Sequence, residues 1–343
     1  MRRTLSLCVG LMLLVGCCSN GDESGTSEGG LTKSELRGPY LGQEAPGSEP
    51  RLFAPGIVST ALTTRDATMM PDGSEFYFSV VVGPRPMIMM VRRTGAVWQQ
   101  PVVAAFSGVH YDIEPWIAPN GSRLYFMSNR PSDGGAPIDA WQNQDLWFVE
   151  RTGETWGEPR PVGPPVNSNR PEYFPSVTQG GVLYFTREDE QGVSWIFRAA
   201  PGADGFLQPE RLGPEVNCGS NRFNAAVAPD ESFVIVPAMG REDGLGGVDY
   251  YVVFRSDDDR WSEPILLGEP VSQAQGREWS ASFSPDGQYL FFMSSRSPGG
   301  VPADLSGMKI DGLQELASQP GRGGSAIWWI DMEVVRKLRP VGF

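Results

Sequence analysis

The stretch that decides the fold is Ser284-Pro285-Asp286-Gly287, followed after one residue by Tyr289-Leu290-Phe291-Phe292. Proline presets φ, aspartate bonds to nearby backbone, and glycine supplies the positive φ that closes a tight turn. The aromatic and aliphatic residues after the turn favour a β-strand. The stretch therefore predicts two antiparallel strands joined by this turn.

The same unit recurs along the chain, with turns beginning at 71, 119, 178, 229 and 285 and a period near 50 residues. Repetition at this period is typical of β-propellers, in which each repeat forms one blade. The copies are Pro71-Asp72-Gly73, Pro119-Asn120-Gly121, Thr178-Gln179-Gly180, Pro229-Asp230-Glu231 and Pro285-Asp286-Gly287.

Two more strands are expected in each repeat. Third strands are indicated by dense aromatic and β-branched residues at 87–91, 145–149, 194–197, 249–253 and 326–330. Fourth strands are predicted where an aromatic residue precedes a proline, which suits an outer edge. These pairs are Trp98 with Pro101, Trp156 with Pro159, Phe206 with Pro209 and Trp261 with Pro264. The chain is thus predicted to be all-β, a single propeller of five four-stranded blades.

The last repeat has no fourth strand of its own, because residues 331–338 read as a short terminal helix. Residues 49–59 align instead with 158–168, so an N-terminal outer strand precedes the first complete repeat. This strand is expected to complete the last blade and close the ring, which leaves no open sheet edge.

Three segments carry a family resemblance: Ser284-Pro285-Asp286-Gly287, Ser128-Asn129-Arg130 and Ser294-Ser295-Arg296. They resemble the WD40-like (PD40) propeller repeats typified by the TolB family, over residues 50–332. The resemblance implies a propeller that engages other proteins. It assigns no reaction, because one propeller fold serves many functions.

The N-terminus reads as an export signal over residues 1–16, with two arginines, an apolar run and a small residue before Cys17. Leu14-Val15-Gly16-Cys17 resembles the bacterial lipobox, which implies cleavage before Cys17 and acylation of its sulfur. An ordinary signal peptide with a chance cysteine is the alternative. Position 18 is Cys rather than Asp, so the same resemblance favours the outer over the inner membrane of a Gram-negative envelope.

A polar tether of residues 17–38 would then connect the lipid to a propeller domain of residues 39–343. The tether is rich in Ser, Gly, Asp and Glu and has too few apolar residues to fold. An insertion at 297–325 interrupts the last blade, and long loops on rigid scaffolds often bind partners.

The chain is acidic, with 28 Lys and Arg against 41 Asp and Glu and a formal charge of −13. Loss of Arg2 and Arg3 with the signal gives −13 − 2 = −15. This charge disfavours nucleic acid as a partner. The sequence has one histidine, His110, no phosphate-binding loop and no paired Cys-x-x-Cys, so no cofactor and no metal are expected. The expected partners are an envelope protein or a glycan, bound by a monomer.

The innermost strands of a propeller line a central channel, so polar residues shortly before each turn are expected at one channel mouth. They could form a ligand site, or they could pair between neighbouring blades and fix the mouth. These candidates are Arg65, Asp66, Asp112, Glu114, Arg170, Glu172, Arg222, Asn224, Arg277 and Glu278.

Two functions fit these residues. The first is a non-enzymatic, lipid-anchored binding scaffold of the envelope. The second is a glycan hydrolase that uses Asp66, Glu114, Glu172 or Glu278 as acid and base. Two free carboxyl groups about 5 to 9.5 Å apart would favour the hydrolase, whereas arginine-paired carboxylates would favour the scaffold.

Overall fold

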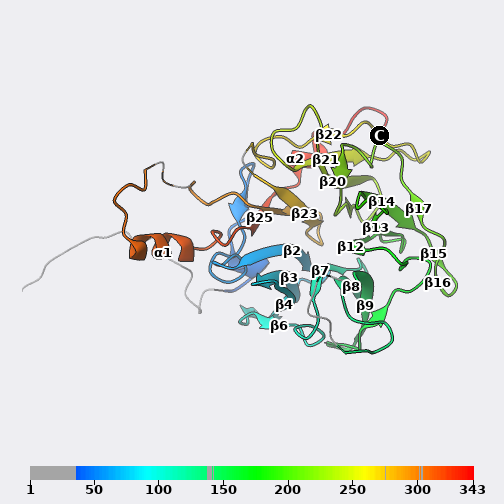
Figure 1. Cartoon of the computed structure of the whole chain (residues 1–343), viewed down its shortest axis with the longest axis horizontal. Helices are drawn as coiled ribbons and strands as arrows, with labels where there is room; N and C mark the ends of the chain where they lie inside the picture. Colours follow the sequence, from blue (N-terminus) through cyan, green and yellow to red (C-terminus); the bar gives the residue numbers. More distant parts are fainter. Residues whose placement is uncertain (1–35, 137–140, 142, 275, 301, 303) are drawn as a thin grey trace, which may run out of the picture. The chain divides into compact units, whose positions relative to one another are not determined.

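The computed structural model describes residues 36–136, 141, 143–274, 276–300, 302 and 304–343. They belong to one compact unit, Leu31–Phe343, built from five main sheets around a common centre (Figure 1). The predicted signal 1–16, Cys17 and most of the 17–38 tether lie outside the described residues. No helix among the described residues is long and apolar enough to cross a membrane.

Each sheet is one antiparallel blade. The first contains β2 (Thr63–Met69), β3 (Glu75–Val82), β4 (Arg85–Thr94), β5 (Val97–Trp98) and β6 (Val102–Val103). The second contains β7 (Asp112–Ile117), β8 (Arg123–Ser128), β9 (Asp145–Thr152), β10 (Thr155–Trp156) and β11 (Arg160–Pro161). The third contains β12 (Glu172–Val177), β13 (Leu183–Glu188), β14 (Ser194–Ala199) and β17 (Glu210–Arg211), with a small hairpin of β15 (Pro201–Gly202) and β16 (Gly205–Phe206).

The fourth blade contains β18 (Asn221–Arg222), β19 (Ala226–Val227), β20 (Phe233–Met239), β21 (Asp249–Phe254) and β22 (Ile265–Leu266). The fifth contains β23 (Glu278–Phe283), β24 (Tyr289–Ser294), β25 (Ala326–Asp331) and β1 (Arg51–Leu52). The inner strands contact one another in a cycle, from β2 through β7, β12, β19 and β23 back to β2. The predicted five-bladed propeller is therefore confirmed.

Ring closure by the N-terminal strand is confirmed as well. In β1, Arg51 lies opposite Trp329 and Leu52 opposite Trp328 of β25. The next residue, Phe53, is fully buried, and its ring packs edge-on against Phe291 at 5.0 Å. Apolar burial thus holds the closing segment in addition to its short ladder.

The repeated turns follow the chemistry of their sequence. Oδ1 of Asp72 and of Asn120 each accepts hydrogen bonds from the backbone and hydroxyl of the serine two residues on. In the third copy the turn runs from Thr178 to Gly181, whose N–H donates to the Thr178 carbonyl. Gln179 therefore occupies the position that proline has in the other copies, one residue later than the predicted start at 178.

The outer strands differ from the prediction in one respect. Trp98, Trp156 and Phe206 lie in β5, β10 and β16, which form hairpin tips beyond the third strands. The outer ladders of these blades begin after the prolines, at β6, β11 and β17. Trp98 is buried at this position, and its indole N–H donates to the Gly38 carbonyl at 2.7 Å.

Little helix is present in the described residues. The predicted terminal helix is found as α2 (Glu333–Arg336), and a single 3-10 turn, η1, spans Tyr40–Gly42. The 297–325 insertion contains α1 (Ile310–Ser318), which has no buried residue and lies apart from the five sheets in Figure 1.

Candidate functional site at the channel mouth

Each inner strand carries one residue with positive φ. These residues lie at the point where four of the inner strands shift register against their neighbour and where β18 gives way to β19. Each stands five residues before the proline position of its turn. Such a backbone costs about 1–3 kcal/mol for a residue other than glycine and is typical of functional sites. The five are Asp66 (60°), Glu114 (62°), Phe174 (48°), Asn224 (51°) and Ser280 (63°).

We call these five the bulge residues. Four of them, Asp66, Glu114, Asn224 and Ser280, meet around Arg65. Its Nε donates to both oxygens of Asp66, at 2.8 and 2.9 Å, and its Nη2 donates to Glu114 Oε1 at 2.7 Å. Nη2 also donates to Ser280 Oγ at 3.0 Å, and Asn224 Nδ2 lies 3.3 Å from Glu114 Oε1. The guanidinium therefore links side chains from three blades directly, and Asn224 of the fourth blade joins them through Glu114 and Ser280.

Glu114 is the most perturbed acid of this cluster. Burial raises its pKa to about 7, Arg65 opposes that rise, and Asp66 adds to it. Oε2 accepts a hydrogen bond from the Phe174 N–H at 2.7 Å, so both carboxylate oxygens have donors. The carboxylate is held in place from three sides.

Two predicted acids lie elsewhere, because they stand two residues before the bulge. Glu172 accepts from Arg187 Nε at 2.7 Å and from the Ser168 N–H at 3.0 Å. Glu278 accepts from Ser294 Oγ at 2.9 Å, and Arg296 is 3.9 Å away. Both side chains are fully buried within their own blades, away from the Arg65 cluster.

Asp112 and Arg222 occupy this same inner position and are also structural. Asp112 bonds Arg130 at 2.6 Å and Ser128 at 2.7 Å, which gives the Ser-Asn-Arg motif its role: the serine and arginine hold the inner-strand acid. Arg222 donates to three backbone carbonyls, including that of Cys218, which is buried.

The remaining two predicted residues do not join the cluster. Arg170 pairs with Glu190 on the surface, and Arg277 is exposed. The structure therefore brings together Arg65, Asp66, Glu114 and Asn224 from the predicted set, and leaves out Asp112, Arg170, Glu172, Arg222, Arg277 and Glu278.

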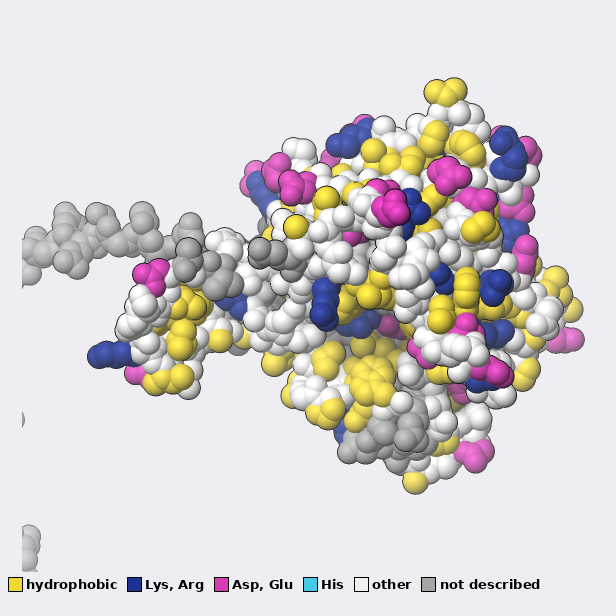
Figure 2. Space-filling model, turned by 45° about the horizontal axis from the view of Figure 1, so that its top comes forward, with side chains coloured by type: hydrophobic (Ala, Val, Ile, Leu, Met, Phe, Trp, Pro, Cys, Tyr) yellow, Lys and Arg dark blue, Asp and Glu magenta, His cyan; other side chains and the backbone are white. Residues whose placement is uncertain are grey.

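A cavity of about 390 Å³ adjoins this cluster. Arg65, Glu114 and Asn224 line it, together with residues that the sequence did not single out. These are Ile113, Met127, Trp141, Gln144, Tyr173, Glu188, Gly192, Ser194, Asn221, Phe223 and Trp279. Figure 2 shows a hollow near the middle of one propeller face, with hydrophobic and basic side chains exposed together around it.

The aromatic wall comes from one repeated position. Tyr173, Phe223 and Trp279 each directly precede a bulge residue, six residues before the proline position of the turn. Arg65 occupies this position in the first blade, and its guanidinium lies 6.0 Å from the Trp279 ring. Counting back a fixed six residues from each turn would have found this wall.

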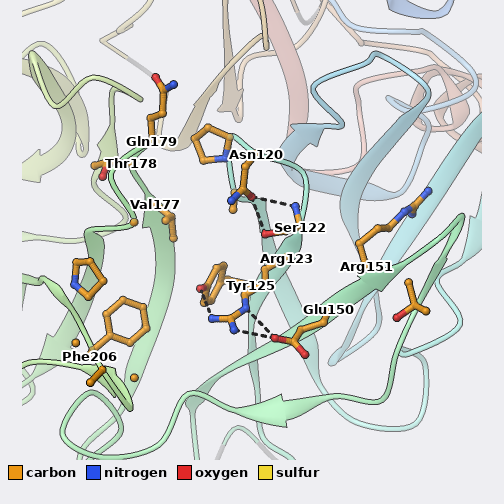
Figure 3. A pocket seen from close by; sticks show the side chains of 18 residues that line it. Asn120, Ser122, Arg123, Tyr125, Glu150, Arg151, Val177, Thr178, Gln179 and Phe206 are labelled. Atoms are coloured by element: carbon orange, nitrogen blue, oxygen red, sulfur yellow. Dashed lines mark hydrogen bonds and ion pairs between the residues drawn. The ribbon is translucent and has the colours of Figure 1, made fainter.

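A larger cavity, of about 580 Å³, lies between the second and third blades beside the turns (Figure 3). Its polar groups bond one another: Arg123 donates to Glu150 at 2.7 Å, and Asn120 accepts from Ser122. Among the described residues no group of three or more His, Cys, Asp or Glu could hold a metal ion.

Comparison with known proteins assigns no family. No protein-family model and no curated protein match the sequence. Among solved structures, TolB from Acinetobacter baumannii is 14% identical with a TM-score of 0.44, over 79% of this chain and 54% of that chain. A putative TolB from Agrobacterium tumefaciens is 14% identical with a TM-score of 0.46, over 79% and 90% of the two chains.

A Coprinopsis cinerea GH62 alpha-L-arabinofuranosidase is similar to the same degree, at 13% identity and a TM-score of 0.45, over 86% of this chain and 96% of that chain. The chain spans about half the length of the Acinetobacter protein. Resemblances this weak do not choose between a binding protein and a glycosidase.

Proposed function

We propose that this protein is an exported, lipid-anchored envelope protein whose propeller binds a ligand at the channel mouth without transforming it. The observation that carries the proposal is the engagement of Arg65 with both Asp66 and Glu114. A general acid or base needs a carboxyl group that can reach the substrate and exchange a proton with it. Here the oxygens of both acids already accept hydrogen bonds from the protein.

The adjoining cavity suits recognition. Its volume of about 390 Å³ is within the range of small-molecule pockets, about 300–1,000 Å³. Aromatic rings supply contact area at low entropic cost, and a few fixed polar groups orient a ligand. A cavity of this size accepts one group of a larger partner, such as a protein side chain or a sugar ring.

A glycan hydrolase is the second candidate, and the pKa of Glu114 favours it. Burial raises that pKa to about 7, the range in which a carboxylic acid serves as a proton donor near neutral pH. The hydrolase would need Glu114 to leave Arg65 when substrate arrives.

The two functions are separated by one set of measurements on the full-length protein in detergent. Pull-down from solubilised envelope and a glycan array report binding, and release of reducing ends reports hydrolysis. We expect binding without product, at least tenfold weaker in Trp279→Ala and unchanged in the control Leu207→Ala, which alters a side chain exposed away from the cavity. Product that disappears in Glu114→Gln would contradict the binding function.

The lipid anchor is tested separately. If Cys17 is acylated, wild-type protein partitions with membranes and carries the added lipid mass at Cys17. Cys17→Ser is expected to lose both properties, whereas Cys18→Ser should keep them. A Cys17→Ser protein that remains acylated in the membrane fraction would contradict the anchor.

A further inference from the structure

The hydrogen-bonding groups of the mouth cavity are unbalanced, and this imbalance indicates the ligand. Asn224 is 3% exposed, and its Oδ1 has no donor among the described residues, although its Nδ2 is used. The guanidinium of Arg65 is already engaged by Asp66, Glu114 and Ser280. An N–H donor would satisfy this buried oxygen, which a ligand in the cavity can reach once the Asn224 side chain turns toward it.

The cavity is also acidic. Glu188, at the end of β13, lines it, and no basic side chain pairs with Glu188 among the described residues. Burial raises the pKa of Glu188, and a bond from Tyr173 opposes the rise. Two carboxyl groups, those of Glu114 and Glu188, thus line the cavity with one guanidinium, that of Arg65, which also pairs with Asp66. The excess is negative, and a cation would neutralise it.

The walls favour a cation as well. The π-faces of Tyr, Phe and Trp attract ammonium and guanidinium groups. Tyr173 and Phe223 line the cavity beside Glu188, and the Phe223 and Trp279 rings meet edge-on at 6.4 Å. Arg65 already places its guanidinium over Trp279, so this wall accepts such a group.

We propose that the mouth cavity binds a lysine or arginine side chain from a basic segment of an envelope protein, between Glu188, the Tyr173 and Phe223 rings and Asn224 Oδ1. This rests on the proposed binding function and names its ligand. A basic segment is favoured over a single amino sugar because the whole chain carries a formal charge of −13, which attracts a partner with several positive charges.

The test uses the full-length protein and defined probes. Titration calorimetry compares acetyl-Lys-Lys-Lys-amide with acetyl-Gln-Gln-Gln-amide, and an oligomer of glucosamine with one of N-acetylglucosamine. We expect the lysine peptide to bind at least tenfold more tightly than the glutamine peptide and the glucosamine oligomer. Binding should weaken as salt rises, because exposed charges are screened.

Two variants locate the binding. Glu188→Gln is expected to weaken lysine-peptide binding about tenfold, whereas the matched control Glu190→Gln, at an exposed acid outside the cavity, leaves it unchanged. Phe223→Leu keeps an apolar side chain but loses the π-face, and should weaken binding about threefold. Unchanged thermal unfolding shows that each variant is folded.

Each contrary result has a distinct meaning. Equal binding of the lysine and glutamine peptides, or an unchanged Kd in Glu188→Gln, overturns the cationic ligand. Preference for the glucosamine oligomer overturns the peptide source. Binding of a neutral glycan that requires Trp279 would contradict the cationic ligand but not the proposed binding function. Hydrolysis of a glycan would contradict the binding function itself.

Discussion

Glu172 in the third blade and Glu278 in the fifth occupy the same position of their inner strands, yet they are held differently. Glu172 accepts hydrogen bonds from Ser168 and Arg187, so both of its oxygens have donors. Glu278 accepts a hydrogen bond from Ser294 on one oxygen, and no donor to its buried Oε2 is found among the described residues. The two acids are equally buried, yet in the described part of the chain both oxygens of Glu172 have hydrogen-bond donors and only one oxygen of Glu278 does.

The cause is visible in the preceding loops. Both loops contain a Pro followed by a buried Val, at Val166 and Val271, and from that point Gln273 of the fifth blade corresponds to Ser168 of the third. The serine hydroxyl donates to Glu172, whereas no bond from the Gln273 side chain to Glu278 is found among the described residues. The fifth-blade loop is also one residue longer between the valine and the acid, so an exchanged side chain and a changed loop length together alter the electrostatics of the blade core.

The largest expected effect comes from Glu172→Gln. The new amide N–H₂ must face either Arg187 or Ser168, both donors, and Arg187 loses its charge partner. Breaking a buried ion pair in this way costs about 3–5 kcal/mol of unfolding free energy. Urea unfolding at pH 7.5 measures it. In Glu278→Gln, Arg296 keeps its hydrogen bonds to the Pro270 and Val271 carbonyls, so we expect a smaller loss. Equal losses in the two variants would refute the comparison.

The next effect is a pH dependence centred on Glu278. Burial raises its pKa to about 7 from an ordinary 4.5, with a contribution from Asp249. Below pH 4.5 both folded and unfolded chains hold this proton, and between pH 4.5 and 7 only the folded chain does. Stability from this group is therefore complete below pH 4.5 and falls as pH rises to about 7, by at most about 3 kcal/mol.

Unfolding of wild type and Glu278→Gln at pH 5 and pH 7.5 checks this dependence. The variant should lose less stability over that interval, with a residual decline from Glu114, whose pKa is also raised to about 7. Identical declines in the two proteins would show that Glu278 does not titrate in this range.

The smallest expected effect makes the two blades alike. Gln273→Ser supplies the hydroxyl that Ser168 gives Glu172, and one added hydrogen bond to a buried acid stabilises by about 1 kcal/mol. It should also lower the pKa of Glu278 and reduce the pH dependence above. Gln273→Ala, which adds no donor, is the control. A gain of the same size in the alanine variant would exclude the hydrogen bond as its cause.

The periodic turn chemistry predicted the architecture well, because each turn combines several residues that favour one conformation. Closure by β1 followed from the alignment of 49–59 with 158–168. The candidate site was harder to predict from the sequence than the architecture. A bulge shifts the inner-strand register by one residue, so Asp66 and Glu114 face the channel, whereas Glu172 and Glu278 turn into their blades.

The aromatic wall was missed for a different reason. In the sequence, Tyr173, Phe223 and Trp279 look like ordinary strand residues, because aromatic side chains are common in strands whatever they face. Only a fixed count back from the turns distinguishes them, and the third turn was placed one residue early. Nothing in the sequence around Glu188 indicated a role at the channel mouth. Glu188 lies at the end of β13 rather than on an inner strand, and only folding of the blade brings it to the cavity.

The closing strand has a mechanical consequence. β1 pairs with β25 through only two residues, Arg51 and Leu52, and the polypeptide that leads to the proposed anchor at Cys17 begins on its N-terminal side. Tension between the membrane and a bound partner reaches this seam only after the contacts of residues 36–42, where Leu36 and Leu41 are buried and the Gly38 carbonyl accepts a hydrogen bond from the Trp98 indole. Phe53, buried just behind the seam, is the side chain that must be extracted before the fifth blade can open.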